Sequence, residues 1–198
     1  MLTFWYDFTS TYSYLAAMRM EDEAARSGVE VVWRPLILGP IFAEAGFKTS
    51  PNIIDPAKAR YMWRDLARRA EGRGLPFRVP ADFPMRSINA ARAALAVSDA
   101  ERPGLSRAIF ERGFGEGRDI NDPAVLAEAV AAAGHDPAAI MDRIGAPEVK
   151  EALRSAVSEA RGQGVFGAPA FICPDGELFW GDDRLADALE WAASRAAG

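Results

Sequence analysis

Segments that favour β-strands lie only near the two ends of this chain of 198 residues. Residues 2–6 form a short apolar run, typical of a buried strand, and residues 29–38 form a second one. Between them, the apolar residues of 11–26 are spaced as in a helix, which Gly28 would close with a left-handed cap. Two strands separated by one helix predict parallel neighbours joined by a right-handed crossover.

The long middle of the chain has a different pattern. From residue 39 to residue 162 no segment reads convincingly as a strand. Three helix starts are instead marked by an aspartate that can cap the helix, followed by a proline at the first helical position. These pairs are Asp55-Pro56, Asp122-Pro123 and Asp136-Pro137. The middle is therefore expected to be all-helical.

Strand signals return near the C-terminus. Residues 170–173 and 177–180 flank the turn Pro174-Asp175-Gly176 and predict a hairpin, and residues 183–195 predict a final helix. The order β-α-β, helical block, β-β-α predicts an α/β chain with a thioredoxin-like fold and an all-helical insertion between its two halves. We expect residues 1–39 and 163–198 to form the thioredoxin-like domain and residues 40–162 to form the inserted helical domain.

Charge and hydropathy exclude two classes of partner. The formal net charge is −5, and Lys and Arg are scattered among the carboxylates, so we expect no nucleic-acid partner. No run approaches the roughly 20 apolar residues that span a membrane, and no leader peptide is recognisable, so no membrane partner and a cytoplasmic location are expected.

Cysteine and histidine are each present only once, as Cys173 and His135. One cysteine cannot form an internal disulfide, a Cys-x-x-Cys redox pair or a thiolate-rich metal site, so no metal is expected. His135 lies in Gly134-His135-Asp136-Pro137, where one helix ends and the next begins, and is expected to be an ordinary surface residue.

Ser10 lies in a turn rich in hydroxyl groups, between the first strand and the first helix. Its ordinary role there is to cap the helix, and the local sequence alone favours that interpretation. A helix N-terminus also has unpaired N–H groups that stabilise an anion, such as a bound thiolate. The turn by itself leaves both roles open.

Two segments together resemble a known family: Asp7-Phe8-Thr9-Ser10-Thr11-Tyr12-Ser13-Tyr14, and the stretch from Gly164 through Ala168-Pro169 to Gly181-Asp182-Asp183-Arg184. The chain resembles the 2-hydroxychromene-2-carboxylate isomerases and their relatives, the kappa-class glutathione transferases, in the DsbA superfamily. The resemblance spans nearly the whole chain, including residues 55–61, 64–66 and 74–77 of the helical middle. Redox members carry Cys-x-x-Cys where this chain has Ser10 and Ser13, which excludes disulfide exchange, and the family usually has Ser-Pro where this chain has Ser10-Thr11.

The resemblance implies glutathione as the cofactor, with Ser10 donating a hydrogen bond to its sulfur. It implies a cis peptide bond between Ala168 and Pro169, which would let the Ala168 backbone pair with the cysteinyl part of glutathione. An ordinary loop proline is the alternative. Asp182 and Asp183 would receive the γ-glutamyl end. Asp183 is the better match, and the additional charge of Asp182 is expected to weaken carboxylate binding.

The helical insertion would cover the sulfur and form the pocket for a second substrate. The resemblance places Lys48 and Asn52 in that pocket, where Lys48 would pair with a substrate carboxylate and Asn52 would orient a hydroxyl group or water. A solvated loop lysine is the alternative for Lys48.

The resemblance therefore predicts a glutathione-dependent isomerase of 2-hydroxychromene-2-carboxylate-type aromatic catabolites, acting by reversible thiolate addition. The small aromatic substrate would be one partner, and a second copy of the chain in a homodimer would be another. Two alternatives stay open: a kappa-like glutathione transferase, and a non-redox peptide-binding module that kept the fold.

Overall fold

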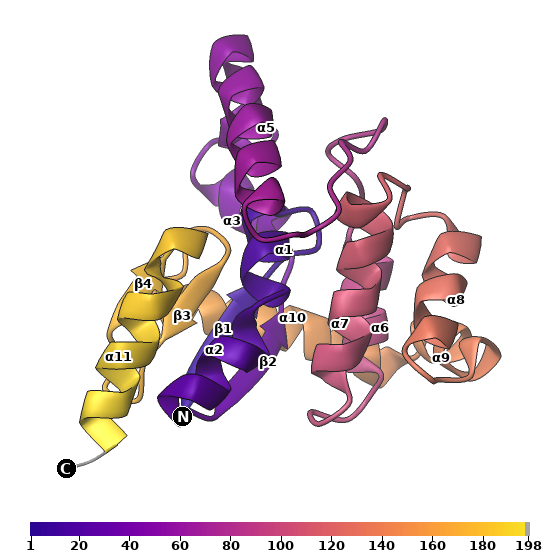
Figure 1. Ribbon diagram of the computed structural model, residues 1–198. Helices are drawn as coiled ribbons and strands as arrows, with labels where there is room; N and C mark the ends of the chain where they lie inside the picture. Colours follow the sequence, from indigo (N-terminus) through magenta and orange to yellow (C-terminus); the bar gives the residue numbers. More distant parts are fainter. Residues whose placement is uncertain (197–198) are drawn as a thin grey trace.

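A four-stranded sheet in the order β2-β1-β3-β4 is the centre of the molecule (Figure 1). The computed structural model describes residues 1–196, except for the side chains of residues 52 and 196. Strand β1 (Leu2–Tyr6) runs parallel to β2 (Val31–Pro35) and antiparallel to β3 (Ala170–Ile172). Strand β4 (Leu178–Trp180) pairs antiparallel with β3. The predicted parallel opening, the hairpin and the thioredoxin-like fold are confirmed.

Helices and the loops between them make up the rest of the chain that the structure describes. In chain order they are α1 (Thr11–Ala17), α2 (Met20–Ser27), α3 (Leu38–Glu44), α4 (Pro51–Ile54), α5 (Pro56–Glu71), α6 (Ile88–Leu95), α7 (Arg102–Phe110), α8 (Pro123–Ala132), α9 (Pro137–Arg143), α10 (Pro147–Gly162) and α11 (Leu185–Ala196). A π-turn (Glu111–Gly115) extends α7, and a 3-10 turn (Asp182–Arg184) precedes α11. None of these helices has the length and hydrophobicity needed to cross a bilayer.

The predicted helix starts are confirmed by their capping bonds. Asp55, Asp122 and Asp136 each accept a hydrogen bond from the backbone N–H two residues further on, at 2.8, 2.8 and 2.9 Å. Each cap is followed by its proline, so the local sequence sets where these helices begin. Gly28 likewise closes α2 with φ of 65°, in the left-handed region that glycine favours.

Two elements near the N-terminus differ from the sequence prediction. The single helix expected over residues 11–26 is broken at Arg19, where φ is −126° and the guanidinium reaches Asp182, 163 residues away. The second strand ends at Pro35 rather than at residue 38, because the buried Asp7 carboxylate binds the Leu38 N–H at 2.7 Å where α3 begins. Both differences come from contacts between distant segments.

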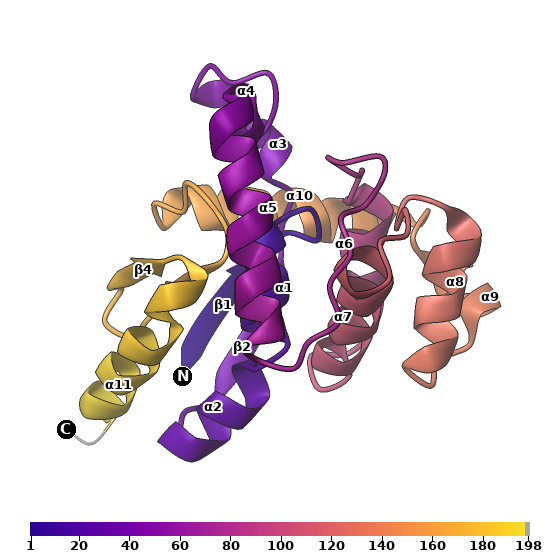
Figure 2. The same cartoon turned by 45° about the horizontal axis from the view of Figure 1, so that its top comes forward.

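The sheet has an apolar core on each face. Leu2 and Phe4 on one face belong to the core that α1, α2 and α11 share. Trp5 on the opposite face packs in a second core with Ala156 and Val157 of α10. Helix α10 lies behind the sheet, α6 to α9 gather on one side of it, and α5 rises above it (Figures 1 and 2). Helix α10 lies within the residues expected for the insertion, yet it packs against the sheet. The expected limits of the inserted domain stay a prediction.

Candidate active site

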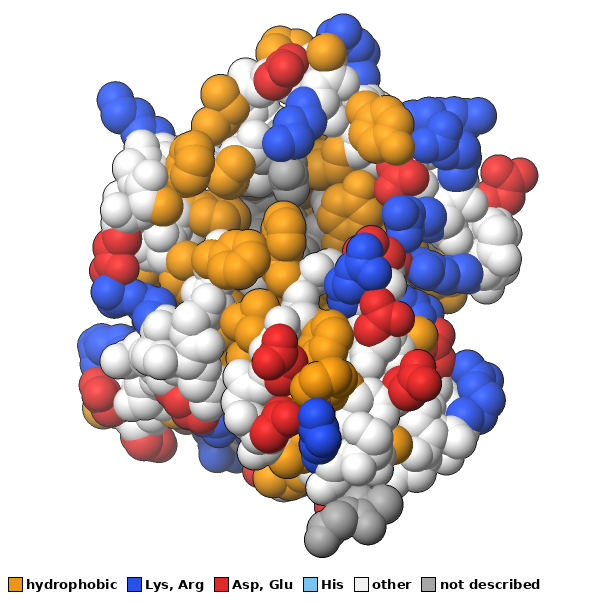
Figure 3. Space-filling model, turned by 90° about the vertical axis from the view of Figure 1, so that its left-hand side faces the viewer, with side chains coloured by type: hydrophobic (Ala, Val, Ile, Leu, Met, Phe, Trp, Pro, Cys, Tyr) orange, Lys and Arg blue, Asp and Glu red, His pale blue; other side chains and the backbone are white. Residues whose placement is uncertain are grey.

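A cavity of about 800 Å³ opens where the turn after β1, helices α3 to α5 and the approaches to β3 and α11 meet. That volume is typical of small-molecule sites. Figure 3 shows this hollow surrounded by hydrophobic side chains, with charged side chains beside it. Phe47, Tyr61, Phe166 and Trp180 line the cavity and are 40–63% exposed. The predicted insertion therefore does contribute to the cavity next to Ser10.

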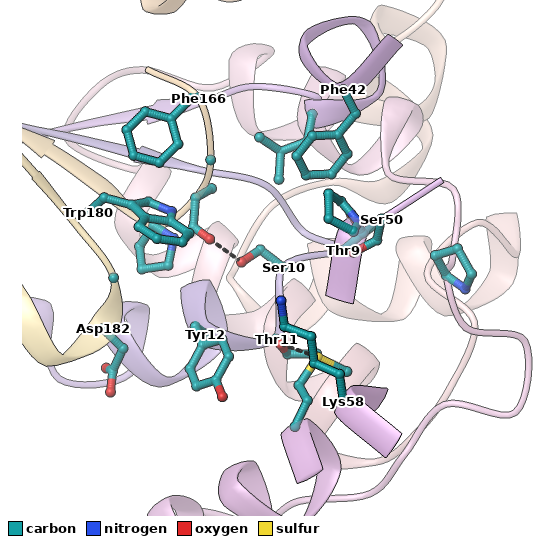
Figure 4. Close-up of a pocket in the computed structure, with 18 of the residues that line it drawn as sticks. Thr9, Ser10, Thr11, Tyr12, Phe42, Ser50, Lys58, Phe166, Trp180 and Asp182 are labelled. Carbon is teal, nitrogen blue, oxygen red and sulfur yellow. Dashed lines mark hydrogen bonds between the residues drawn. The ribbon is translucent and has the colours of Figure 1, made fainter. Parts of the chain in front are cut away.

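Ser10 lies in the cavity wall as the N-cap of α1. Its Oγ accepts a hydrogen bond from the Ser13 N–H at 3.2 Å and donates one to the Ala168 carbonyl at 2.7 Å (Figure 4). Thr11, in place of the family's usual proline, takes the first helical position without disturbing this cap. Ser13 is fully buried, and its Oγ has no partner in the described part of the chain. Ser10 thus both caps the helix and faces the cavity.

The turn that carries Ser10 is held by the buried Asp7. The Asp7 carbonyl accepts the Ser10 N–H at 2.9 Å, and its carboxylate accepts the Thr9 N–H at 2.9 Å. Burial raises the pKa of Asp7, and the hydrogen bonds from Thr9 and Leu38 oppose that rise. Within residues 1–196, the N–H groups of Thr11 and Tyr12 donate to no protein acceptor, as expected for the first turn of a helix.

The peptide bond between Ala168 and Pro169 is cis, as the family resemblance implied. The Pro169 carbonyl accepts the Gly181 N–H at 3.0 Å, which fixes this segment beside the start of α11. Gly167 lies so close to Trp180 that a Cβ there would be 2.5 Å from the indole nitrogen, so a larger residue would displace the indole ring. The Ala168 N–H has no acceptor among the described residues and lies at the cavity wall, where it is free to bind a ligand.

One face of α5 supplies side chains that the sequence analysis missed. Lys58, Met62, Asp65 and Arg69 all line the cavity. They are spaced by four, three and four residues, which places them on one face of a helix. The Lys58 side chain points towards Ser10 (Figure 4). Because Asp55-Pro56 marks the start of this helix, its cavity-facing residues could have been found from their spacing once its orientation was known.

The cavity has two polar regions. We call Ser10, Ala168 and Lys58 the Ser10 end, and Asp65, Arg69, Asp182 and Asp183 the charged end. At the charged end, Asp65 accepts hydrogen bonds from the Tyr12 hydroxyl at 3.0 Å and from Arg69 Nε at 2.8 Å. Burial alone would raise the pKa of Asp65, but these hydrogen bonds outweigh it and hold the pKa below its usual value.

Asp182 and Asp183 are adjacent but differently placed. Asp182 is 1% exposed, and its carboxylate contacts Arg19 at 2.9 Å, Arg73 at 3.0 Å and Arg69 at 3.5 Å. The additional negative charge at Asp182 is thus balanced within the protein. The expected weakening of carboxylate binding stays a prediction. Asp183 is 53% exposed at the cavity and pairs at 3.6 Å with Arg184.

The two residues predicted to bind the second substrate have different outcomes. Lys48 is exposed in the loop between α3 and α4 and does not line the cavity, so the structure gives the solvated alternative. Lys58, ten residues further on, lies at the cavity because α5 turns this face towards Ser10. Asn52 lies in α4, but its side chain is outside the described residues, and its role stays a prediction.

No cluster of metal-binding side chains occurs in the part of the chain that the structure describes. Cys173 is buried, and burial raises the pKa of its thiol to about 11. Cys173 belongs to the apolar core and is not among the residues that line the cavity. A reactive sulfur at the Ser10 end would therefore have to come from a ligand.

Comparison with known proteins shows the family of this chain. A family model described as a DSBA-like thioredoxin domain matches residues 1–190. A 2-hydroxychromene-2-carboxylate isomerase from Sphingobium xenophagum is 32% identical over 189 residues, which cover 96% of this chain and 95% of the relative. Glutathione S-transferase kappa 1 from Homo sapiens is 27% identical and covers 91% of this chain and 85% of its own.

A solved structure agrees as well. The structure of a 2-hydroxychromene-2-carboxylate isomerase superposes with a TM-score of 0.85 at 26% identity, covering 99% of this chain and 95% of the other. Sequence and structure thus each match a 2-hydroxychromene-2-carboxylate isomerase over 95% of its length. The chain therefore belongs to the DsbA-like thioredoxin family and, within it, to the 2-hydroxychromene-2-carboxylate isomerase family.

Proposed function

We propose that this protein is a glutathione-dependent isomerase of 2-hydroxychromene-2-carboxylate-type aromatic catabolites. The observation that carries the proposal is the Ser10 end: a hydroxyl, a strand-like backbone segment before a cis-proline and a lysine converge on one cavity. A transferase named for glutathione and isomerases of this aromatic acid are among the relatives, and this chain has no exposed thiol of its own within residues 1–196.

The residues of the cavity fit glutathione. The free Ala168 N–H suits the cysteinyl backbone of a peptide laid along this segment as an added strand. Asp183 and Arg69 at the charged end provide both signs of charge, as an α-amino acid group requires. A cavity of about 800 Å³ is large enough for a tripeptide together with a small aromatic acid.

Ser10 would act by changing its hydrogen-bond acceptor. Its proton is now donated to the Ala168 carbonyl at 2.7 Å, and rotation of the hydroxyl would direct it to a sulfur in the cavity. The free N–H groups of Thr11 and Tyr12 and the Lys58 ammonium would favour the anionic form of that sulfur. Glutathione, when bound, supplies a thiolate that can add reversibly to a conjugated double bond and so permit rotation about it.

The apolar part of the cavity would hold the ring of the second substrate. Phe42, Phe47 and Phe83 line this part, and Phe166 and Trp180 lie at its mouth with ring centroids 5.0 Å apart. Aromatic side chains bury flat rings with favourable edge and face contacts. We therefore propose that Phe42 contacts the substrate.

Calorimetric titration with glutathione and spectrophotometric turnover of 2-hydroxychromene-2-carboxylate test the proposal. We expect glutathione to bind and a substoichiometric amount of it to sustain many turnovers, because it is not consumed. Stoichiometric loss of glutathione into an adduct would indicate the transferase instead. No detectable binding at millimolar glutathione would reject both enzymes and leave the peptide-binding module.

The proposal also includes a homodimer in the cytoplasm. Light scattering coupled to gel filtration gives the mass of the particle, for which twice the chain mass is expected. A mass of one chain would reject the dimer without bearing on the chemistry of the cavity.

A further inference from the structure

Arg69, which the sequence did not predict as a site residue, belongs to a cluster of charges around Asp182. Asp182 is 1% exposed, yet three guanidinium groups surround it, from Arg19 between α1 and α2 and from Arg69 and Arg73 of α5. An ionised carboxylate is rarely this buried unless it is paired. Glu23 also pairs with Arg19 and Asp65 with Arg69, so the charges around Asp182 are compensated within the protein.

The three arginines differ in their access to the cavity. Arg69 is among the residues that line it, whereas Arg19 and Arg73 are not. The Arg69 side chain is 36% exposed. Arg69 can therefore contact a ligand, while the other two compensate the charge of Asp182.

Two carboxylates fix the position of Arg69. Its Nε donates to Asp65 at 2.8 Å, and its Nη1 donates to Asp182 at 3.5 Å. A guanidinium has five N–H donors, so these two bonds leave three. A guanidinium held in this way has already lost much of its side-chain freedom, and it matches a carboxylate in shape and charge.

Resting on the proposed function, we infer that Arg69 recognises the α-carboxylate of the γ-glutamyl residue of the bound peptide. Asp183, which lies at the same end of the cavity and is exposed, would pair with the ammonium on the same carbon. Asp182 is then a positioning residue that holds Arg69, and the site selects a peptide thiol with a free amino-acid end.

Two peptides test this without any substitution. Glutathione is compared by calorimetry with 4-aminobutyryl-cysteinyl-glycine, which keeps the ammonium and the thiol and lacks only the α-carboxylate. We expect the wild-type protein to bind the shortened peptide roughly 10- to 100-fold more weakly, the usual range for a charge-assisted hydrogen bond. Equal affinities would overturn the role of Arg69 and leave the proposed glutathione binding intact.

Substitution then assigns the effect to one side chain. R69A should weaken glutathione binding by the same factor and leave the affinity for 4-aminobutyryl-cysteinyl-glycine unchanged, and R69K should recover part of the loss. R68A is the matched control, because Arg68 is the adjacent arginine of α5 and does not line the cavity. It should leave both affinities unchanged.

The remaining outcomes each decide against the inference. Equal weakening of both peptides by R69A would mean that Arg69 only supports the structure. If the wild-type protein binds neither peptide, the proposed function fails and the inference fails with it.

Discussion

The two polar ends of the cavity are built by different means. The Ser10 end depends on backbone groups of a turn and of the segment before a cis-proline, and Ser10 itself binds only neutral partners, the Ala168 carbonyl and the Ser13 N–H. The charged end depends on ionised side chains from α5 and from the start of α11 that compensate one another. The Ser10 end should therefore matter most for chemistry, and the charged end for both stability and binding.

Replacing Asp182 gives the largest expected effect on stability. D182A leaves three arginines without their shared carboxylate. Removing one partner of a fully buried pair costs about 3–5 kcal/mol, and solvent access to the arginines reduces this, so we expect a loss of about 2–3 kcal/mol. Urea unfolding measures this loss in the free energy of unfolding.

D183A, at the exposed neighbouring residue, is the matched control. It should lower the free energy of unfolding by less than about 0.5 kcal/mol and yet weaken glutathione binding. Similar losses for both variants would remove the distinction between them.

Replacing Ser10 tests the opposite end. S10A removes a single hydrogen bond to the sulfur, so we expect turnover to fall about 10- to 100-fold while glutathione affinity changes little. The lost cap should cost about 1 kcal/mol of stability. S13A, which removes a buried hydroxyl without a partner, is the control and should keep normal turnover. Unchanged turnover in S10A would reject the assigned role of Ser10.

The pH dependence of stability should reveal the charged end. The pKa of Asp65 is lower in the folded state than in the unfolded state. The ionised Asp65 carboxylate therefore adds to the free energy of unfolding above the unfolded pKa of about 3.9. This stabilisation is lost as pH falls through the lower pKa of the folded state. D65N should cost about 1 kcal/mol at pH 7, and the difference from wild type should shrink below about pH 4. Unfolding measured from pH 7 to pH 3 checks this. A difference that stays constant with pH would mean that ionisation of Asp65 contributes nothing.

The smallest expected effect separates two lysines. K58A removes a cation that points towards Ser10, so the Kd for glutathione should rise about two- to fivefold, less so at high salt. K48A removes a cation in an exposed loop and should leave the Kd unchanged. Calorimetric titration with glutathione measures both Kd values. A raised Kd in K48A and an unchanged Kd in K58A would favour Lys48 as the lysine of the pocket, as the family resemblance implied.

Much of the fold could be predicted because its signals are local. Asp55, Asp122 and Asp136 each bind an N–H two residues away, and Gly28 needs only its own backbone angle. The alternation of strands and helices then led to the sheet and its connections. The cis bond before Pro169 followed from the family resemblance, because an isolated proline carries no such information.

The sequence by itself thus determined the order of elements, the helix starts, the exclusion of disulfide exchange and the placement of Ser10 and Asp183. Only the tertiary structure decided that Asp182 is enclosed by arginines, that Lys58 rather than Lys48 faces the cavity and that the first helix breaks at Arg19. Asp182 is 163 residues from Arg19, 113 from Arg69 and 109 from Arg73. Helical periodicity and capping act over a few residues, whereas contacts like these exist only after α5 and α11 have packed around the sheet.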